Sequence, residues 1–302
     1  LWARDPAAAA AIRATGGSPR LPGIAIAPPV EATDDLAAAL AGVDLILLAV
    51  PAQAVRALCE RLRPLLARPV PAVICAKGIE AGSGLLMSEV LAEALPGLPT
   101  AVLSGPTFAA EVAAGKPTAV TLACADPRLG AALVARLGRP HFRPYLSSDP
   151  VGAQLGGAVK NVLAIACGIV EGRGLGDNAR AALVTRGLAE MLRLGRAKGA
   201  RPETLMGLCG LGDLVLTCTS RQSRNLSLGT ALGEGRTLTE ALAAGRGTVE
   251  GVATAPALVR LARGLGVEMP IAEAVAAILH GGASIDATIA ALLARPYKAE
   301  DA

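Results

Sequence analysis

The lysines of this sequence are the residues whose placement says most about chemistry. The 302-residue chain contains five of them against 24 arginines, so a lysine inside an apolar run suggests that a titratable amine is needed there. Lys160 is such a residue, because it follows Gly156 and Gly157 within the apolar run 151–166. Burial of the ammonium would lower its pKa toward neutrality and suit it to general acid–base chemistry. A lysine that extends its amine to solvent is the alternative that the spacing leaves open.

A second group of polar residues begins at Asp213, which ends a glycine-rich apolar run. Thr217 lies four residues later and Arg224 eleven residues later. In one continuous helix the three side chains would share a face, where they could hold a lysine and a phosphate together. A helix cap at Asp213 with a solvated Arg224 fits the same residues. The polar segment 220–226, with two arginines, predicts either a phosphate clamp or a surface loop.

The first half of the chain alternates short apolar runs with helical patterns, which predicts a parallel sheet built from βαβ units. The expected strands are 44–50, 72–76, 101–103, 118–123 and 141–146, and the expected helices are 52–66, 84–95 and 127–137. Doubly wound sheets bind ligands at the edge where their strands end. Lys77-Gly78 and Ser104–Thr107 both follow strands, so their backbone N–H groups could contact an anion there. Tight turns require the same residue types.

From residue 149 onward, the strand-like runs give way to helical patterns separated by glycine and proline. The expected helices are 150–170, 178–198, 202–210, 238–244, 254–265, 269–280 and 285–294. We therefore expect an α/β fold with a Rossmann-like parallel sheet in a dinucleotide-binding domain over residues 1–148. An all-α domain for substrate binding and catalysis is expected over residues 149–302.

The composition excludes several classes of function. The net charge is +4 and only 2% of the residues are aromatic, and no basic run interleaved with aromatics points to nucleic acid. Six scattered cysteines without a CxxC pair indicate buried thiols in a reducing, cytoplasmic compartment. Two histidines without ligand spacing predict no metal site. The apolar stretch 151–170 contains Gln154, Lys160 and Asn161, which favours a buried helix over a membrane span.

The beginning of the chain lacks a motif that dinucleotide-binding folds place there. Such folds open with a strand, a Gly-x-Gly-x-x-Gly turn and a helix, and no such motif occurs near Leu1. The segment 1–5 is typical of the end of the second strand, so we expect that the first βα unit is missing. Arg4 would then read a phosphate or stack on adenine, although a surface arginine explains it equally simply.

A series of short motifs follows one order along nearly the whole chain. They are Leu-Trp-Ala-Arg4, Ala-Val-Pro51, Ala-Lys-Gly78, Leu-Ser-Gly-Pro-Thr-Phe-Ala109, Ala-Val-Lys-Asn161, Gly-Leu-Gly-Asp-Leu-Val-Leu-Thr-Cys-Thr219, Ser-Arg-Asn225 and Val-Glu-Gly251. Together they resemble the bacterial-type NAD(P)-dependent glycerol-3-phosphate dehydrogenases, and their number and spacing make the resemblance specific. The family opens with the glycine-rich loop that this sequence lacks, and it more often has an aliphatic residue where Thr248 stands.

The resemblance implies a reaction and a set of site residues. The reaction is the interconversion of sn-glycerol 3-phosphate and dihydroxyacetone phosphate with NAD or NADP, which supplies the glycerol phosphate backbone of phospholipids. Lys160 would be the catalytic proton acceptor in oxidation and the donor in reduction. The residues implied to bind substrate are Lys77, Gly105, Thr107, Lys160, Asp213, Ser223, Arg224 and Asn225. The residues implied to contact the cofactor are Arg4, Lys77, Ala109, Arg224, Thr248 and Glu250.

The same resemblance implies a small-molecule substrate as the partner, a cytoplasmic location and a possible homodimer. Two other functions remain open at this point. One is a different two-domain Rossmann dehydrogenase of the ketopantoate or hydroxyisobutyrate type, which also places a lysine on a long helix but does not explain the cluster at Ser223–Asn225. The other is a non-catalytic remnant that binds a partner, an interpretation that the missing glycine loop supports.

Overall fold

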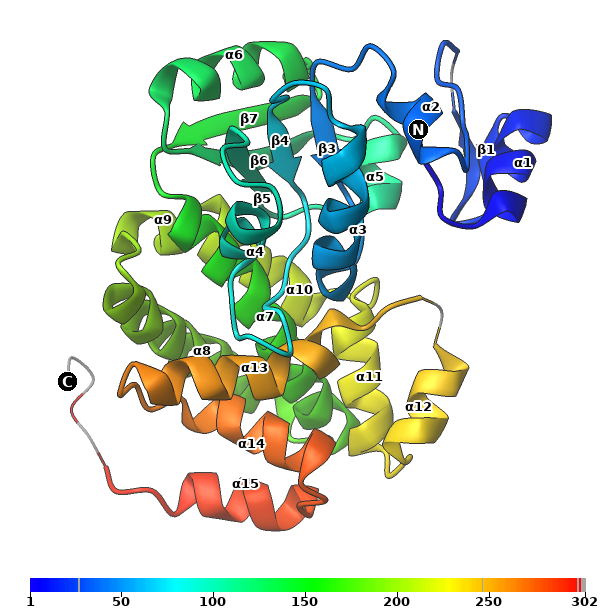
Figure 1. Cartoon of the computed structure of the whole chain (residues 1–302). Helices are drawn as coiled ribbons and strands as arrows, with labels where there is room; N and C mark the ends of the chain where they lie inside the picture. Colours follow the sequence, from blue (N-terminus) through cyan, green and yellow to red (C-terminus); the bar gives the residue numbers. More distant parts are fainter. Residues whose placement is uncertain (27, 246, 298, 300–302) are drawn as a thin grey trace.

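The computed structural model describes residues 1–26, 28–245, 247–297 and 299 (Figure 1). A sheet flanked by helices occupies one end of the molecule, and a group of helices occupies the other. The last sheet strand ends at Ser147, and the helices of the second group begin at Pro150. The chain therefore changes architecture at the position where its sequence pattern changes.

The sheet has the strand order β3-β4-β5-β6-β7. Its strands are β3 (Ile46–Leu48), β4 (Ala72–Ile74), β5 (Thr100–Ser104), β6 (Thr118–Cys124) and β7 (Phe142–Ser147). The pairs β3–β4, β4–β5 and β6–β7 are parallel, as predicted, whereas β6 runs antiparallel to β5. The expectation of a wholly parallel sheet is therefore wrong at this one pairing.

The connection between β5 and β6 explains the reversal. It contains only the five-residue helix α5 (Ala109–Ala113), which is too short to carry the chain back along the sheet, as a parallel crossover requires. The chain therefore re-enters the sheet at the edge where it left. As a result, the ends of β3, β4 and β5 and the beginning of β6 share one edge.

Three longer helices accompany the sheet. They are α3 (Val55–Leu62), which lies between the 3-10 turns Ala52–Ala54 and Arg63–Leu65, α4 (Met87–Ala94) and α6 (Pro127–Leu137). Their buried faces repeat with helical spacing, as in Val55, Leu58, Cys59 and Leu62 of α3. Each lies within the range that the sequence predicted.

The segment before β3 differs from its prediction. It forms α1 (Pro6–Thr15), the hairpin of β1 (Gly17–Ser18) and β2 (Leu21–Ala25), and α2 (Leu36–Leu40). Trp2 makes an isolated parallel bridge with Thr33, and within the described residues this segment adds no strand to the five-stranded sheet. Figure 1 shows α1 and the hairpin projecting to one side of the sheet.

The helical half is built around α7. Its elements are α7 (Pro150–Gly172), α8 (Gly176–Lys198), α9 (Pro202–Met206), the π-helical segment η3 (Leu208–Gly212), α10 (Asp213–Thr219), α11 (Arg224–Gly233), α12 (Leu238–Ala244), α13 (Glu250–Gly264), α14 (Pro270–His280) and α15 (Ile285–Leu293). The predicted helix 202–210 breaks at Gly207, whose φ of −89° and ψ of −158° are extended. α11 was not predicted.

Residues 152–170 of α7 are buried without interruption. By length and composition α7 could cross a membrane, but its most apolar stretch lies entirely inside the protein. Its glycines explain how other elements approach so closely. A Cβ added at Gly168 would lie 2.1 Å from the carbonyl oxygen of Leu226, on α11. The predicted buried helix is confirmed, and it forms the axis on which the candidate site is assembled.

Candidate active site

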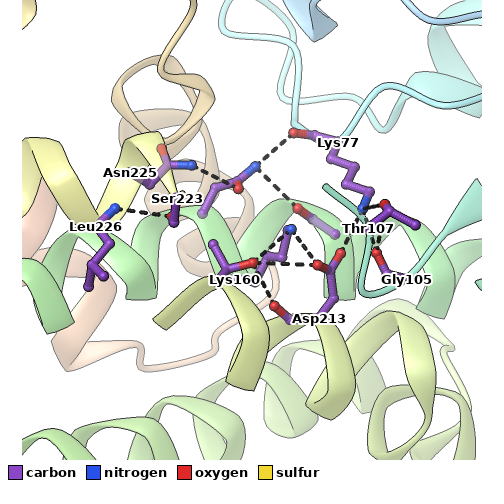
Figure 2. A network of polar contacts seen from close by, with 11 residues as sticks. Lys77, Gly105, Thr107, Lys160, Asp213, Ser223, Asn225 and Leu226 are labelled. Carbon is purple, nitrogen blue, oxygen red and sulfur yellow. Dashed lines mark hydrogen bonds and ion pairs between the residues drawn. The ribbon is translucent and has the colours of Figure 1, made fainter. Parts of the chain in front are cut away.

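The amine of Lys160 is buried and bonded to α10 (Figure 2). Its Nζ donates to Oδ1 of Asp213 at 2.6 Å and to Oγ1 of Thr217 at 2.9 Å. Lys160 is 6% exposed and Asp213 is fully buried, so the amine does not extend to solvent. Because α10 begins at Asp213, this carboxylate and Thr217 stand one turn apart on the helix face that meets α7.

Lys77 reaches the same carboxylate from the sheet. It follows β4, and its Nζ donates to Oδ2 of Asp213 at 2.8 Å, to the carbonyl oxygen of Gly105 at 2.8 Å and to Oγ1 of Thr107 at 3.3 Å. Gly105 has a φ of 144°, a conformation that favours glycine. The loops that follow β4 and β5 therefore meet the helical half at Asp213.

Two glycines of α7 allow this meeting. A Cβ at Gly156 would lie 2.4 Å from the carbonyl oxygen of Cys209, and a Cβ at Gly157 would lie 2.9 Å from Oγ of Ser104 and 3.2 Å from Cγ of Lys77. Side chains at these positions would hold η3 and the β4 loop away from α7. Gly156 and Gly157 thus allow η3 and the β4 loop to pack directly against α7, the helix that carries Lys160.

The electrostatics of the cluster favour a readily lost proton on Lys160. Burial and then the positive charge of Lys77 lower the pKa of Lys160, Asp213 opposes both effects, and the resulting pKa is about 8. Burial disfavours the charged form of an amine. A lysine whose pKa lies near neutrality can both take and give a proton under physiological conditions.

Asn161, which was not among the predicted site residues, pairs with the predicted Asn225 and links the cluster to α11 and α13. Nδ2 of Asn161 donates to the backbone oxygen of Lys77 at 3.0 Å, and Oδ1 of Asn161 accepts from Nδ2 of Asn225 at 3.0 Å. Oδ1 of Asn225 accepts in turn from the backbone N–H of Gly251 at 2.9 Å. The signal in the sequence was an amide next to Lys160 within an apolar run.

Asp213, Thr217 and Arg224 do not share one helix. The chain leaves α10 at Thr219, and α11 begins at Arg224, with Ser223 capping it by accepting from the N–H of Leu226 at 3.2 Å. The expectation of a common helical face therefore holds for Asp213 and Thr217, which both contact Lys160, and fails for Arg224. Ser220 and Ser223 are extended and a turn lies between them, so the chain changes direction before α11.

Arg224 lies instead beside the beginning of α13. It is exposed, a Cβ added at Gly247 would lie 2.6 Å from its Nη1, and its charge acts on Glu250. Oε1 of Glu250 accepts from the backbone N–H of Ala52 at 3.1 Å. Burial raises the pKa of this carboxyl, while its Oε2 and the buried Oγ1 of Thr254 have no hydrogen-bond partner among the described residues.

The remaining predicted residues lie outside the polar network. Ala109 begins α5 and Thr248 precedes α13, and both are exposed. Arg4 is exposed in the N-terminal segment, and no described hydrogen bond or ion pair joins it to the cluster around Asp213. Within the described ranges, no group of three His, Cys, Asp or Glu side chains is arranged to hold a metal ion.

Comparison with known proteins points to one family. Residues 1–130 match the model described as NAD-dependent glycerol-3-phosphate dehydrogenase N-terminus, and residues 149–290 match the C-terminus of the same family. The chain is 60% identical over 301 residues to the glycerol-3-phosphate dehydrogenase (NAD(P)+) of Rhodospirillum rubrum, covering 99% of this chain and 86% of that protein.

Solved structures agree with the sequence comparison. The crystal structure of glycerol-3-phosphate dehydrogenase from Coxiella burnetii superposes with a TM-score of 0.94 at 42% identity, covering 98% of this chain and 91% of that one. A ketopantoate reductase from Ralstonia eutropha gives a TM-score of 0.57 at 16% identity over 94% of this chain and 90% of that one. The second likeness is one of fold alone.

Proposed function

Because the chain belongs to the NAD-dependent glycerol-3-phosphate dehydrogenase family, we propose that it interconverts sn-glycerol 3-phosphate and dihydroxyacetone phosphate with NAD or NADP. The observation that carries the proposal is the buried Lys160 amine, bonded to Asp213 at 2.6 Å with its pKa lowered to about 8. In cells this reaction would supply the glycerol phosphate backbone of phospholipids.

Lys160 is the proposed proton-transfer group. In oxidation the neutral amine takes the proton of the C2 hydroxyl, and in reduction the ammonium gives a proton to the C2 oxygen as the carbonyl becomes an alcohol. While negative charge grows on that oxygen, the adjacent ammonium stabilises it. A bound nicotinamide supplies the hydride acceptor or donor. Asp213 and Thr217 hold the amine in place throughout.

The phosphate is proposed to bind where α11 begins. Arg224 is exposed there, and a guanidinium can form two parallel charge-assisted hydrogen bonds with a phosphate. Ser223 and Asn225 flank it in sequence and are buried. The loop residues Gly105 and Thr107 would face the rest of the substrate, with Lys77 on the wall that substrate and cofactor share.

One carboxylate oxygen at the start of α13 could accept a hydrogen bond from a bound dinucleotide. Oε2 of Glu250 is an acceptor without a described partner, and ribose hydroxyls are donors. We propose that Glu250 and Thr248 contact the cofactor, together with Ala109, Lys77 and Arg224. Arg4 is proposed to contact the adenosine side.

We further propose that residues 1–148 form the dinucleotide-binding domain and residues 149–302 the substrate-binding and catalytic domain. The change of architecture between Ser147 and Pro150 supports this division. The proposed partner is a small phosphorylated molecule, the proposed location is the cytoplasm and the proposed assembly is a homodimer. Sedimentation of the purified chain would test the assembly.

A substrate panel tests the function. Oxidation of NADH and of NADPH by the purified chain would be followed by absorbance with dihydroxyacetone phosphate, dihydroxyacetone and ketopantoate. We expect turnover with dihydroxyacetone phosphate and little with the two others, because neither of them offers a phosphate to Arg224. Turnover with ketopantoate alone, or no saturable binding of either nucleotide, would contradict the proposal.

A further inference from the structure

The ammonium of Lys77 has no hydrogen left for a ligand. A lysine ammonium carries three hydrogens and no acceptor. Lys77 has three acceptors: the backbone oxygen of Gly105, Oγ1 of Thr107 and Oδ2 of Asp213, at 2.8, 3.3 and 2.8 Å. A substrate oxygen could bond to this amine only by displacing one of them.

The amine of Lys160 is arranged differently. Among the described residues it bonds only to Oδ1 of Asp213 and Oγ1 of Thr217. The hydroxyl hydrogen of Thr217 points elsewhere, because its Oγ1 donates to the backbone oxygen of Asp213 at 2.6 Å. One of the three positions on the Lys160 nitrogen is therefore available to a reacting oxygen.

Both amines depend on one carboxylate. Each oxygen of Asp213 is taken by a different lysine, so a single negative charge faces two ammonium groups, and one positive charge remains uncompensated. The side chain of Lys160 is 8% exposed and that of Lys77 is 16% exposed. Burial and a neighbouring like charge both disfavour protonation, and Lys160, the more buried amine, is subject to both.

We propose that Lys77 is a positioning residue which acts through Asp213: it fixes the carboxylate, and its positive charge makes the Lys160 amine release its proton more readily. This rests on the proposed function and goes beyond it, since the resemblance assigns Lys77 only to ligand contacts. The direction agrees with the pKa of Lys160, which burial and then the charge of Lys77 lower to about 8.

The other ionisable groups near Lys160 do not replace this effect. Cys218 of α10 also faces the amine, but its hydrogen bond with Cys167 and its burial raise the pKa of its thiol well above the ordinary value, so it stays neutral while Lys160 titrates. Five charged side chains on the helices around α7 have their described interactions elsewhere; these are Glu190, Glu203, Arg224, Glu250 and Glu273.

The small number of lysines makes a direct test possible. A chain labelled with [ε-13C]lysine has five lysines to give signals, and the signal of Lys160 is the one that disappears in Lys160→Met. We expect it to titrate near pH 8 in the unaltered chain. In Lys77→Met its midpoint should rise by roughly one unit or more, because a like charge within a few ångströms shifts a buried group by that order.

Lys77→Arg is the matched control, since it keeps the positive charge and should leave the midpoint of Lys160 nearly in place. A Lys160 midpoint at about 10.4, the ordinary lysine value, in the unaltered chain would overturn the proposal. So would an unmoved midpoint in Lys77→Met, or an equal rise in Lys77→Arg. Circular dichroism would check folding, and Lys77→Gln would be titrated if the Met variant does not fold.

A kinetic measurement separates this inference from the function on which it rests. Reduction needs a protonated Lys160, so the pH above which the reduction rate falls should move upward in Lys77→Met together with the NMR midpoint. The NMR titration requires no substrate. Failure of turnover in the unaltered chain would therefore count against the proposed function, whereas an unmoved titration would count against the role of Lys77.

Discussion

The two halves of the site bring their lysines to Asp213 by different means. Lys77 stands on the loop after β4, and backbone contacts hold it: its own oxygen accepts from Asn161, and its amine donates to the oxygen of Gly105. Lys160 stands inside α7, where every residue from 152 to 170 is buried, and side chains of α10 hold it. The loop therefore holds the Lys77 amine in place by hydrogen bonds, whereas the helix keeps the Lys160 amine away from solvent.

The difference shows which half controls protonation. Desolvation is the largest cause of the lowered pKa of Lys160, and the buried α7 supplies it. A strand-end loop keeps part of its surface toward solvent, as the 16% exposure of the Lys77 side chain shows. The helical half therefore supplies the burial that lowers the pKa of Lys160, and the sheet half supplies the second positive charge.

Removing the buried amine should have the largest effect. In Lys160→Ala, reduction of dihydroxyacetone phosphate should fall by roughly 10²–10⁴-fold, the usual contribution of a positioned acid–base group. Steady-state rates with NADH would measure the loss, and a thermal melt would show that the fold persists, since Lys77 still pairs with Asp213. Near-normal turnover would place proton transfer on another residue.

Removing the shared carboxylate should affect both halves at once. Asp213→Asn leaves two ammonium groups without their common counter-charge, and breaking a buried ion pair typically destabilises by about 3–5 kcal/mol. Urea denaturation would measure this change. Asp286→Asn is a suitable control, because it removes an exposed pair with Arg173 and should cost at most about 1 kcal/mol. Equal effects of the two substitutions would show that burial of the site matters little.

The packing of α7 can be tested without touching the site. In Gly168→Ala, the added Cβ would meet the oxygen of Leu226 at 2.1 Å, so we expect a loss of about 1–3 kcal/mol from overpacking. Gly264→Ala is the matched control, because Gly264 is also helical and its added Cβ would have nothing within 4 Å. That variant should be neutral or slightly stabilised. A stable Gly168→Ala would mean that α11 can move away from α7 at little cost.

A pH-dependent effect is expected for a second buried carboxyl in the helical half. Burial raises the pKa of Glu190 to about 7 from an ordinary 4.5, so its contribution to stability is full below pH 4.5 and is lost as the pH rises through 7. Glu190→Gln cannot titrate. The difference in melting temperature, unaltered chain minus variant, should therefore shrink between pH 5 and pH 8; a constant difference would contradict the shifted pKa.

Much of the fold follows from local patterns in the sequence. The buried helix around Lys160 was predicted from an apolar stretch that polar residues interrupt, and α6 (Pro127–Leu137) and α12 (Leu238–Ala244) have the predicted bounds. Four of the longer helices begin with proline: α1, α6, α7 and α14. Proline suits the first turn of a helix, so these starts can be read from the sequence. Short elements such as α2 and β1 were not predicted, since so few residues carry little periodicity.

The sequence by itself determined the place of the long buried helix, the bounds of helices such as α6 and α12 and which family the motifs resemble, because periodicity and composition are properties of neighbouring residues. Only the tertiary structure decided that β6 runs against β5, that Arg224 leaves the face of Asp213 and that Asn161 bonds to the loop of Lys77. It also decided which of two lysines keeps a free hydrogen. Strand direction and the choice of hydrogen-bond acceptor depend on groups distant in the chain, and the spacing of neighbouring residues carries no information about them.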